Sequence, residues 1–115
     1  MLVMVRITKL AFVLILLLSR QVQANDFDQL CKLFEGFTHD KQFLKADSAA
    51  RVAIVDKALA IDFPNGSPVI DTWNGVQNAM PEFRYELIQD AAFSLNHRTF
   101  ECAALKMLIV NTGYN

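Results

Sequence analysis

The stretch FDQLCKLFEGF, residues 27–37, decides the fold of this chain. Its apolar side chains recur at every third or fourth position: Phe27, Leu30, Cys31, Phe34 and Phe37. That spacing places side chains on one face of an α-helix. Asn25 or Asp26 can begin such a helix by accepting hydrogen bonds from its free N–H groups. The stretch therefore predicts an amphipathic first helix that turns a cysteine and several aromatic rings toward a core.

A second helix is predicted from Asp47 or Ser48 to about Ala60, because either residue is a good N-terminal cap. Its apolar residues form two stripes, one of Val52, Val55 and Leu59 and the other of Ala50, Ile54, Ala58 and Ile61. A helix with two apolar stripes is expected to pack against neighbours on two sides.

The clearest break in the chain is the stretch PNGSP, residues 64–68. Asn-Gly favours a turn, and each proline disfavours helix in the residue before it. Pro68 suits the first position of a third helix, with Ser67 as its cap. An apolar stripe at helical spacing follows: Val69, Trp73, Val76 and Met80. We expect Trp73 to be buried at the centre of the fold.

Two further helices are expected after this one. Pro81 either kinks the third helix or opens a fourth, which runs to about Leu95 with a core face of Arg84, Tyr85, Ile88, Ala91, Ala92 and Leu95. Thr99 can cap the fifth and Gly113 can end it, and its apolar stripe consists of Cys102, Leu105 and Ile109. No run of β-branched residues alternates with polar ones over the length of a strand. The sequence thus predicts an all-α fold, a small bundle of four to five short helices.

The beginning of the chain has the pattern of a secretory signal peptide. Arg6 and Lys9 give a basic start, residues 10–18 are an unbroken apolar run, and Val22-Gln23-Ala24 places small side chains before a cleavage site. A membrane-spanning helix needs roughly 20 apolar residues, so a retained anchor is the less favoured alternative. We predict a signal peptide over residues 1–24, cleaved after Ala24, and one helical domain over residues 25–115.

Cys31 and Cys102 are the two cysteines of the chain. A domain of this size buries only roughly 60 to 65% of the surface that its unfolded chain exposes, and small exported domains commonly add disulfides. We therefore predict a Cys31–Cys102 disulfide that joins the first and last helices, with two separate buried thiols as the alternative. The sequence has no CxxC or HxxxH pattern, so no metal site and no cofactor is predicted.

The charge of the predicted domain is acidic. The whole chain holds 11 Lys and Arg against 12 Asp and Glu, and the leader contains Arg6, Lys9 and Arg20 but no acidic residue. A net negative domain weighs against nucleic acid as a partner, since phosphate binding needs a clustered basic surface. It also weighs against docking to an anionic membrane. His39 and His97 fall in predicted loops, and no catalytic constellation surrounds them, so we expect no enzyme activity.

One face of the fourth helix is unusual. Phe83 and Phe93 fall opposite Ile88 and Leu95, interleaved with Glu86 and Asp90. Aromatic rings among charges on an outward face are typical of a partner surface, although a central helix would bury both rings. We therefore predict an exported, periplasmic or secreted protein-binding module of the cell envelope, such as an inhibitor, an immunity-type protein or an accessory subunit. An acid-stress chaperone or a carrier of a small apolar ligand is the alternative, and the oligomeric state stays open.

Overall fold

The computed structural model describes residues 26–114, which form six helices and no strand. The helices are α2 (Asp26–Phe37), α3 (Lys41–Lys45), α4 (Ser48–Asp62), α5 (Pro68–Val76), α6 (Pro81–Asn96) and α7 (Ala103–Ile109). The predicted all-α fold is confirmed for this part of the chain. The predicted signal peptide with its cleavage site, Asn25 and Asn115 lie outside the described residues.

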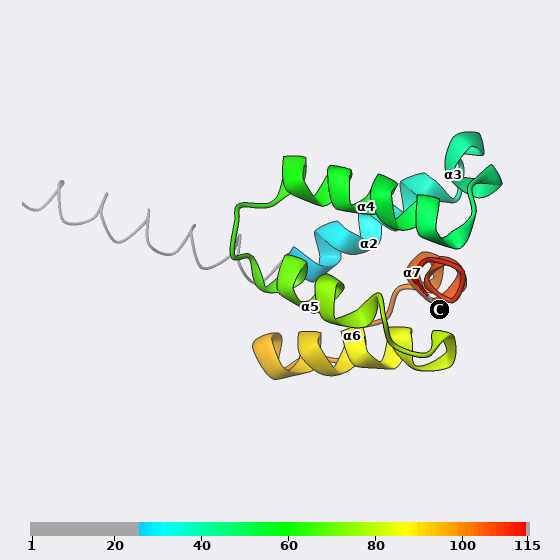
Figure 1. The fold of residues 1–115 in the computed structure, drawn as a ribbon. Helices are drawn as coiled ribbons and strands as arrows, with labels where there is room; N and C mark the ends of the chain where they lie inside the picture. Colours follow the sequence, from blue (N-terminus) through cyan, green and yellow to red (C-terminus); the bar gives the residue numbers. More distant parts are fainter. Residues whose placement is uncertain (1–25, 115) are drawn as a thin grey trace, which may run out of the picture.

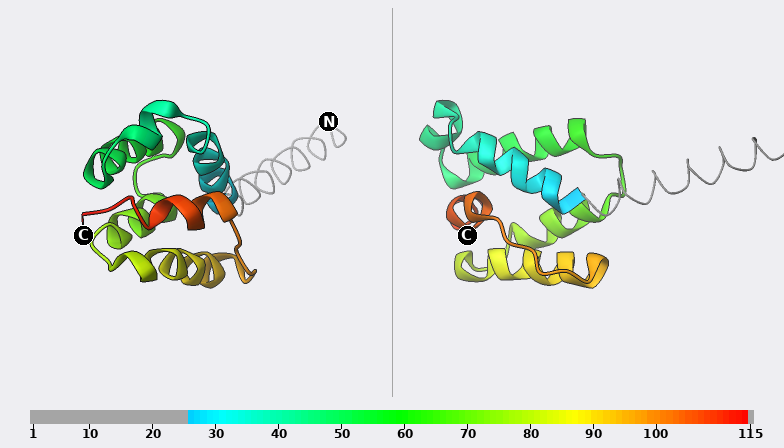
Figure 2. Two further views of the ribbon diagram at one scale, coloured as in Figure 1. Left: turned by 90° about the vertical axis from the view of Figure 1, so that its right-hand side faces the viewer. Right: turned by 180° about the vertical axis from the view of Figure 1, so that it is seen from behind.

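The helices pack around α2, which contacts α3, α5 and α7. Figure 1 shows α4 and α6 on opposite sides of the molecule, with α2 and α5 between them. Helix α7 is seen end-on in Figure 1 and along its length in the left view of Figure 2, so it runs across the direction of α4 and α6. It contacts both α2 and α6. The last helix therefore closes one end of the bundle.

The apolar face of α2 forms much of the core, as its spacing predicts. Phe27, Leu30, Phe34 and Phe37 are all buried. The ring of Phe34 lies 5.9 Å from the ring of Trp73 on α5, and the ring of Phe37 stacks on that of Phe43 with centroids 4.4 Å apart. Aromatic pairs at such distances stabilise a core beyond the area that they bury.

Helix α3 is a correction to the predicted count of four to five helices. Asp40 accepts hydrogen bonds from the backbone N–H groups of Gln42 and Phe43 and so begins this helix. The helix holds five residues, which is too short for an apolar period to be recognised. This short helix places the ring of Phe43 against the ring of Phe37.

Helix α4 begins where its caps predict, and its two apolar stripes are buried to different degrees. Asp47 accepts a hydrogen bond of 2.8 Å from the N–H of Ala50. The stripe of Val52, Val55 and Leu59 is buried. The second predicted stripe is confirmed only in its middle, where Ile54 and Ala58 are partly buried against the core, whereas Ala50 is exposed and Ile61 is 77% exposed. The ends of this stripe are exposed because α4 lies at the outside of the bundle (Figure 1).

The start of α5 confirms the interpretation of the PNGSP break. Pro68 is at its first turn, and the side chain of Ser67 accepts from the N–H of Val69. Trp73 is 1% exposed, so its predicted burial is confirmed. Met80 does not continue the buried stripe, because α5 ends at Val76 and leaves the methionine 55% exposed at the start of α6.

Two predicted boundaries at the end of the chain are wrong. Helix α7 begins after Cys102 rather than after Thr99, and it ends at Ile109 rather than at Gly113. Side chains of α6 hold the connecting segment extended instead. The Tyr85 hydroxyl accepts from the N–H of Cys102, and the Gln89 amide donates to the carbonyl of Phe100. Sequence periodicity cannot register such contacts between elements.

The predicted Cys31–Cys102 disulfide is present, with Cα atoms 5.7 Å apart. This distance is typical of a disulfide. It joins the middle of α2 to the residue that precedes α7. The first and last described helices are thus linked covalently as predicted.

Arg84 anchors the end of the chain to α6. Its side chain is fully buried, and its guanidinium donates to the carbonyls of Ala79, Ile109 and Val110. Burial lowers the pKa of this guanidinium from its ordinary value, but an arginine stays charged in proteins. Hydrogen bonds from a charged donor are about twice as strong as neutral ones. The sequence placed Arg84 correctly on the core face of α6.

Gly113 makes this anchor possible, because a Cβ at position 113 would lie against the Arg84 guanidinium. We expect Gly113→Ala to lower the free energy of unfolding by about 1 to 3 kcal/mol, the usual cost of overpacking. Urea unfolding measures it. The loss should shrink in an Arg84→Met background, where the guanidinium is absent. Gly36→Ala is the control, since nothing lies within 4 Å of a Cβ there, and it should not destabilise the protein.

Candidate functional site

The outer face of α6 carries the aromatic residues that the sequence singled out. Phe83 is 49% exposed and Phe93 is 54% exposed. Glu86 and Asp90 are exposed between them along the same helix. The structure therefore does not bury the two rings in a central helix, and Figure 1 shows α6 at the edge of the bundle. Their role as a partner surface stays a prediction.

The opposite side of α6 explains why this face points outward. Arg84, Ile88 and Ala92 are buried and recur at every fourth position. Because that stripe is buried, the residues on the opposite side of the helix face solvent. Leu95 was predicted on the core face but is exposed, and it lines a cavity at the end of the helix.

Leu87 belongs to the same outward face, and the sequence analysis missed it. It follows Phe83 by four positions, which places the two side chains next to each other on the helix. It is exposed like Phe83. Helical spacing was the signal that could have found it. We call the set Phe83, Glu86, Leu87, Asp90 and Phe93 the α6 face.

The exposed charges on α6 itself have one sign. Glu82, Glu86 and Asp90 are the acidic residues of α6, and all three are exposed. The single cation of the helix, Arg84, is buried and bonded to backbone carbonyls. The solvent-facing side of α6 therefore presents carboxylates and apolar side chains without an exposed cation.

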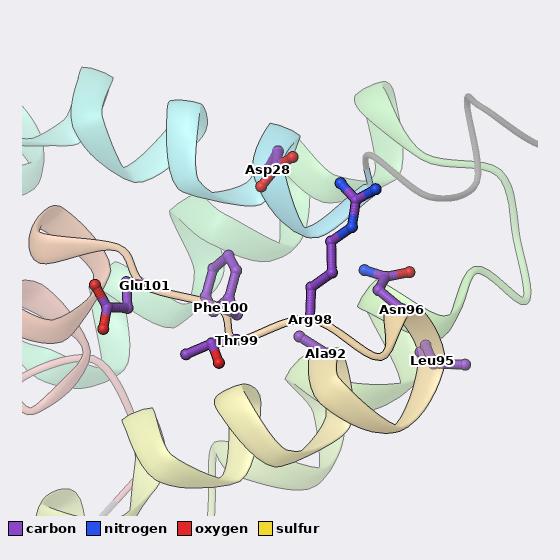
Figure 3. A pocket seen from close by; sticks show the side chains of 8 residues that line it. All are labelled: Asp28, Ala92, Leu95, Asn96, Arg98, Thr99, Phe100 and Glu101. Carbon is purple, nitrogen blue, oxygen red and sulfur yellow. The ribbon is translucent and has the colours of Figure 1, made fainter.

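A cavity of about 800 Å³ lies on the other side of the C-terminal end of α6. It is bounded by the start of α2, the last turn of α6 and residues 98–101, with Asp28, Asn96, Arg98, Phe100 and Glu101 among its lining residues (Figure 3). Sequence reasoning did not find this cavity. Its residues come from separate elements, and none of them forms a motif along the chain.

The two histidines do not form a shared site, and the backbone of each makes a hydrogen bond at a helix end or in a turn. His97 ends α6 in the left-handed conformation with φ of 55°, and its N–H donates to the carbonyl of Phe93. His39 lies in the turn before α3, where its N–H donates to the carbonyl of Gly36. Residues 26–114 contain no group of three or more His, Cys, Asp or Glu side chains arranged to hold a metal ion.

Several acidic residues have specific structural partners. Asp56 accepts hydrogen bonds from the indole N–H of Trp73 at 2.8 Å and the amide of Gln77 at 3.1 Å. Burial raises the pKa of Asp26, while a hydrogen bond from the Ser67 hydroxyl opposes that rise. These contacts join helices to one another and do not form a catalytic arrangement.

Comparisons with known proteins add no assignment, since the chain matches no protein-family model, no curated protein and no solved structure. Among the helices of the described residues, none is long and apolar enough to cross a membrane. The α6 face and the cavity are thus interpreted from their own chemistry.

Proposed function

We propose that this protein is a non-catalytic protein-binding module of the cell envelope, an inhibitor, an immunity-type protein or an accessory subunit, and that the α6 face binds its partner. The observation that supports this proposal is the exposure of Phe83 and Phe93 among carboxylates on one rigid helix. Exposed aromatic residues contribute most of the binding energy at many protein interfaces.

The charge of the α6 face defines the kind of partner. Its exposed ionisable groups are carboxylates, and no exposed cation lies on α6 to pair with them. Complementary charge accelerates association and selects against partners of the wrong sign. The partner is therefore a protein with an apolar contact surface surrounded by lysine and arginine.

The back of α6 prepares the helix for binding. Arg84 fixes it to α7 through the carbonyls of Ile109 and Val110, and Ile88 and Ala92 pack into the core. A helix held in this way loses little further conformational freedom when a partner binds. Preorganisation of this kind increases affinity because less entropy is lost on association.

The cellular location is part of the same proposal. The predicted leader, residues 1–24, directs export, and cleavage after Ala24 releases a periplasmic or secreted domain. The Cys31–Cys102 disulfide supports this location, since disulfides form and persist in oxidising compartments. The alternative function is an acid-stress chaperone or a carrier of a small apolar ligand. Rings that are exposed in the folded protein favour a binder over a chaperone that uncovers apolar surface only in acid.

The proposal predicts the behaviour of the variant Phe83→Ser/Phe93→Ser. Capture of the partner from envelope extracts, followed by mass spectrometry, should be lost. The melting temperature should stay nearly unchanged, because half-exposed side chains away from the core contribute little to stability.

The matched control is Leu44→Ser/Ile61→Ser, which removes two exposed apolar side chains from α3 and α4. It should capture the same partner as the wild type. Undiminished capture by the Phe83→Ser/Phe93→Ser variant would contradict the proposed interface. A large fall in its melting temperature would show that the two rings support the fold instead.

A further inference from the structure

The cavity between α2 and the end of α6 has opposite charges on its two sides. Figure 3 shows the Arg98 guanidinium and the Asn96 amide on one side and Glu101 on the other, with the Phe100 ring between them. The carboxylate of Asp28 faces this arrangement from α2. We propose that the cavity is a binding site for a short peptide with free termini, separate from the α6 face.

One side of the cavity suits the carboxylate end of such a ligand. Within residues 26–114 the Arg98 side chain has no hydrogen-bond or ion-pair partner. A guanidinium offers paired N–H groups that match the two oxygens of a carboxylate. The Asn96 amide beside it supplies further N–H donors. The peptide's terminal carboxylate binds to these two side chains.

The other side suits an ammonium group. Asp28 and Glu101 contribute two carboxylates to the lining, against the single cation Arg98. The lining as a whole is therefore net negative, which disfavours a ligand that is only an anion, such as free phosphate. A ligand that carries one charge of each sign meets both sides. The peptide's N-terminal ammonium lies toward Glu101, while Asp28 faces the cavity from α2 between the two ends (Figure 3).

The floor and the size of the cavity define the middle of the ligand. Leu95 is an exposed apolar residue of its lining, and Phe100 beside it is largely buried. Ligand pockets commonly have volumes of about 300 to 1,000 Å³, and the 800 Å³ of this cavity falls in that range. A peptide of roughly two to four residues with an apolar side chain at its centre suits such a space.

The test is a titration of ¹⁵N-labelled protein, lacking the leader, with the tripeptide Ala-Phe-Ala, followed by NMR. Backbone signals of residues 96–101 should shift. Arg98→Gln should weaken binding by about tenfold or more, since a charge-assisted contact is lost. Amidation of the peptide's carboxylate should weaken binding to the wild type similarly, and should cost little further in Arg98→Gln. Acetylation of the peptide's amine should also weaken binding to the wild type, and it should cost little further binding in Glu101→Gln.

The controls are Lys57→Gln on α4 and Glu82→Gln at the start of α6, which remove exposed charges outside the cavity. Both should bind the tripeptide like the wild type. Unshifted signals at residues 96–101 with millimolar peptide would overturn the proposal, and so would equal binding of the free and doubly blocked peptides. Partner capture by the α6 face is measured separately, so either proposal can fail while the other holds.

Discussion

Replacing Trp73 by alanine is expected to lower the free energy of unfolding by about 3 to 5 kcal/mol, the usual range for a large core aromatic residue. The side chain is 1% exposed and contacts the ring of Phe34 on α2. Its indole N–H donates to Asp56 on α4 at 2.8 Å. The single side chain thus joins α5 to two other helices, and truncation leaves a cavity that none of them can fill alone.

Urea unfolding followed by circular dichroism measures the Trp73→Ala effect, and Trp73→Phe separates its causes. The phenylalanine keeps most of the buried ring but cannot donate to Asp56. Its loss should therefore be much smaller than that of alanine, with a hydrogen-bond contribution of about 1 kcal/mol. A loss under about 1 kcal/mol for Trp73→Ala itself would mean that the indole does not support the core.

Removing the disulfide with Cys31→Ala/Cys102→Ala is expected to cost about 4 kcal/mol. The bridge spans a sequence separation of 71 residues, and the chain-entropy model gives about this value for a closed loop of that length. The free energy of unfolding of a small domain is commonly about 5 to 15 kcal/mol. Alanine is the suitable replacement because Cys102 is buried, where a serine hydroxyl would need a hydrogen-bond partner.

The disulfide prediction is checked by comparing thermal unfolding of the wild type and the variant with and without a reductant. The reductant should lower the wild-type melting temperature toward that of Cys31→Ala/Cys102→Ala and leave the variant unchanged. Thiol titration of the unfolded, non-reduced wild type should find no free cysteine. Two free thiols in that titration would refute the bridge.

Features determined by neighbouring residues were predictable from the sequence. The Asp47 cap of α4 and the Ser67 cap with Pro68 in α5 depend on hydrogen bonds and sterics within one helical turn. The outward position of Phe83 and Phe93 followed from helical spacing within α6. The disulfide was predictable because the chain has one possible pair.

Features that depend on packing between distant segments were missed. Ile61 has the spacing of a core residue but is 77% exposed, at the end of a helix on the outside of the bundle (Figure 1). Cys102 precedes α7 in place of Thr99, because Tyr85 on α6 binds the backbone there. The cavity around Arg98 forms only when α2, α6 and residues 98–101 come together. The spacing of apolar residues along the sequence contains no information on contacts between distant segments.

The position of the disulfide also determines what a protease can do to this molecule. Cys31 and Cys102 close a covalent ring that contains α3, α4, α5 and α6 entirely. A single cut at any peptide bond inside the ring leaves two chains that are still linked through sulfur. Nicked protein should therefore migrate as one species until it is reduced. The helix that presents Phe83 and Phe93 stays attached to the remainder of the domain even after such damage.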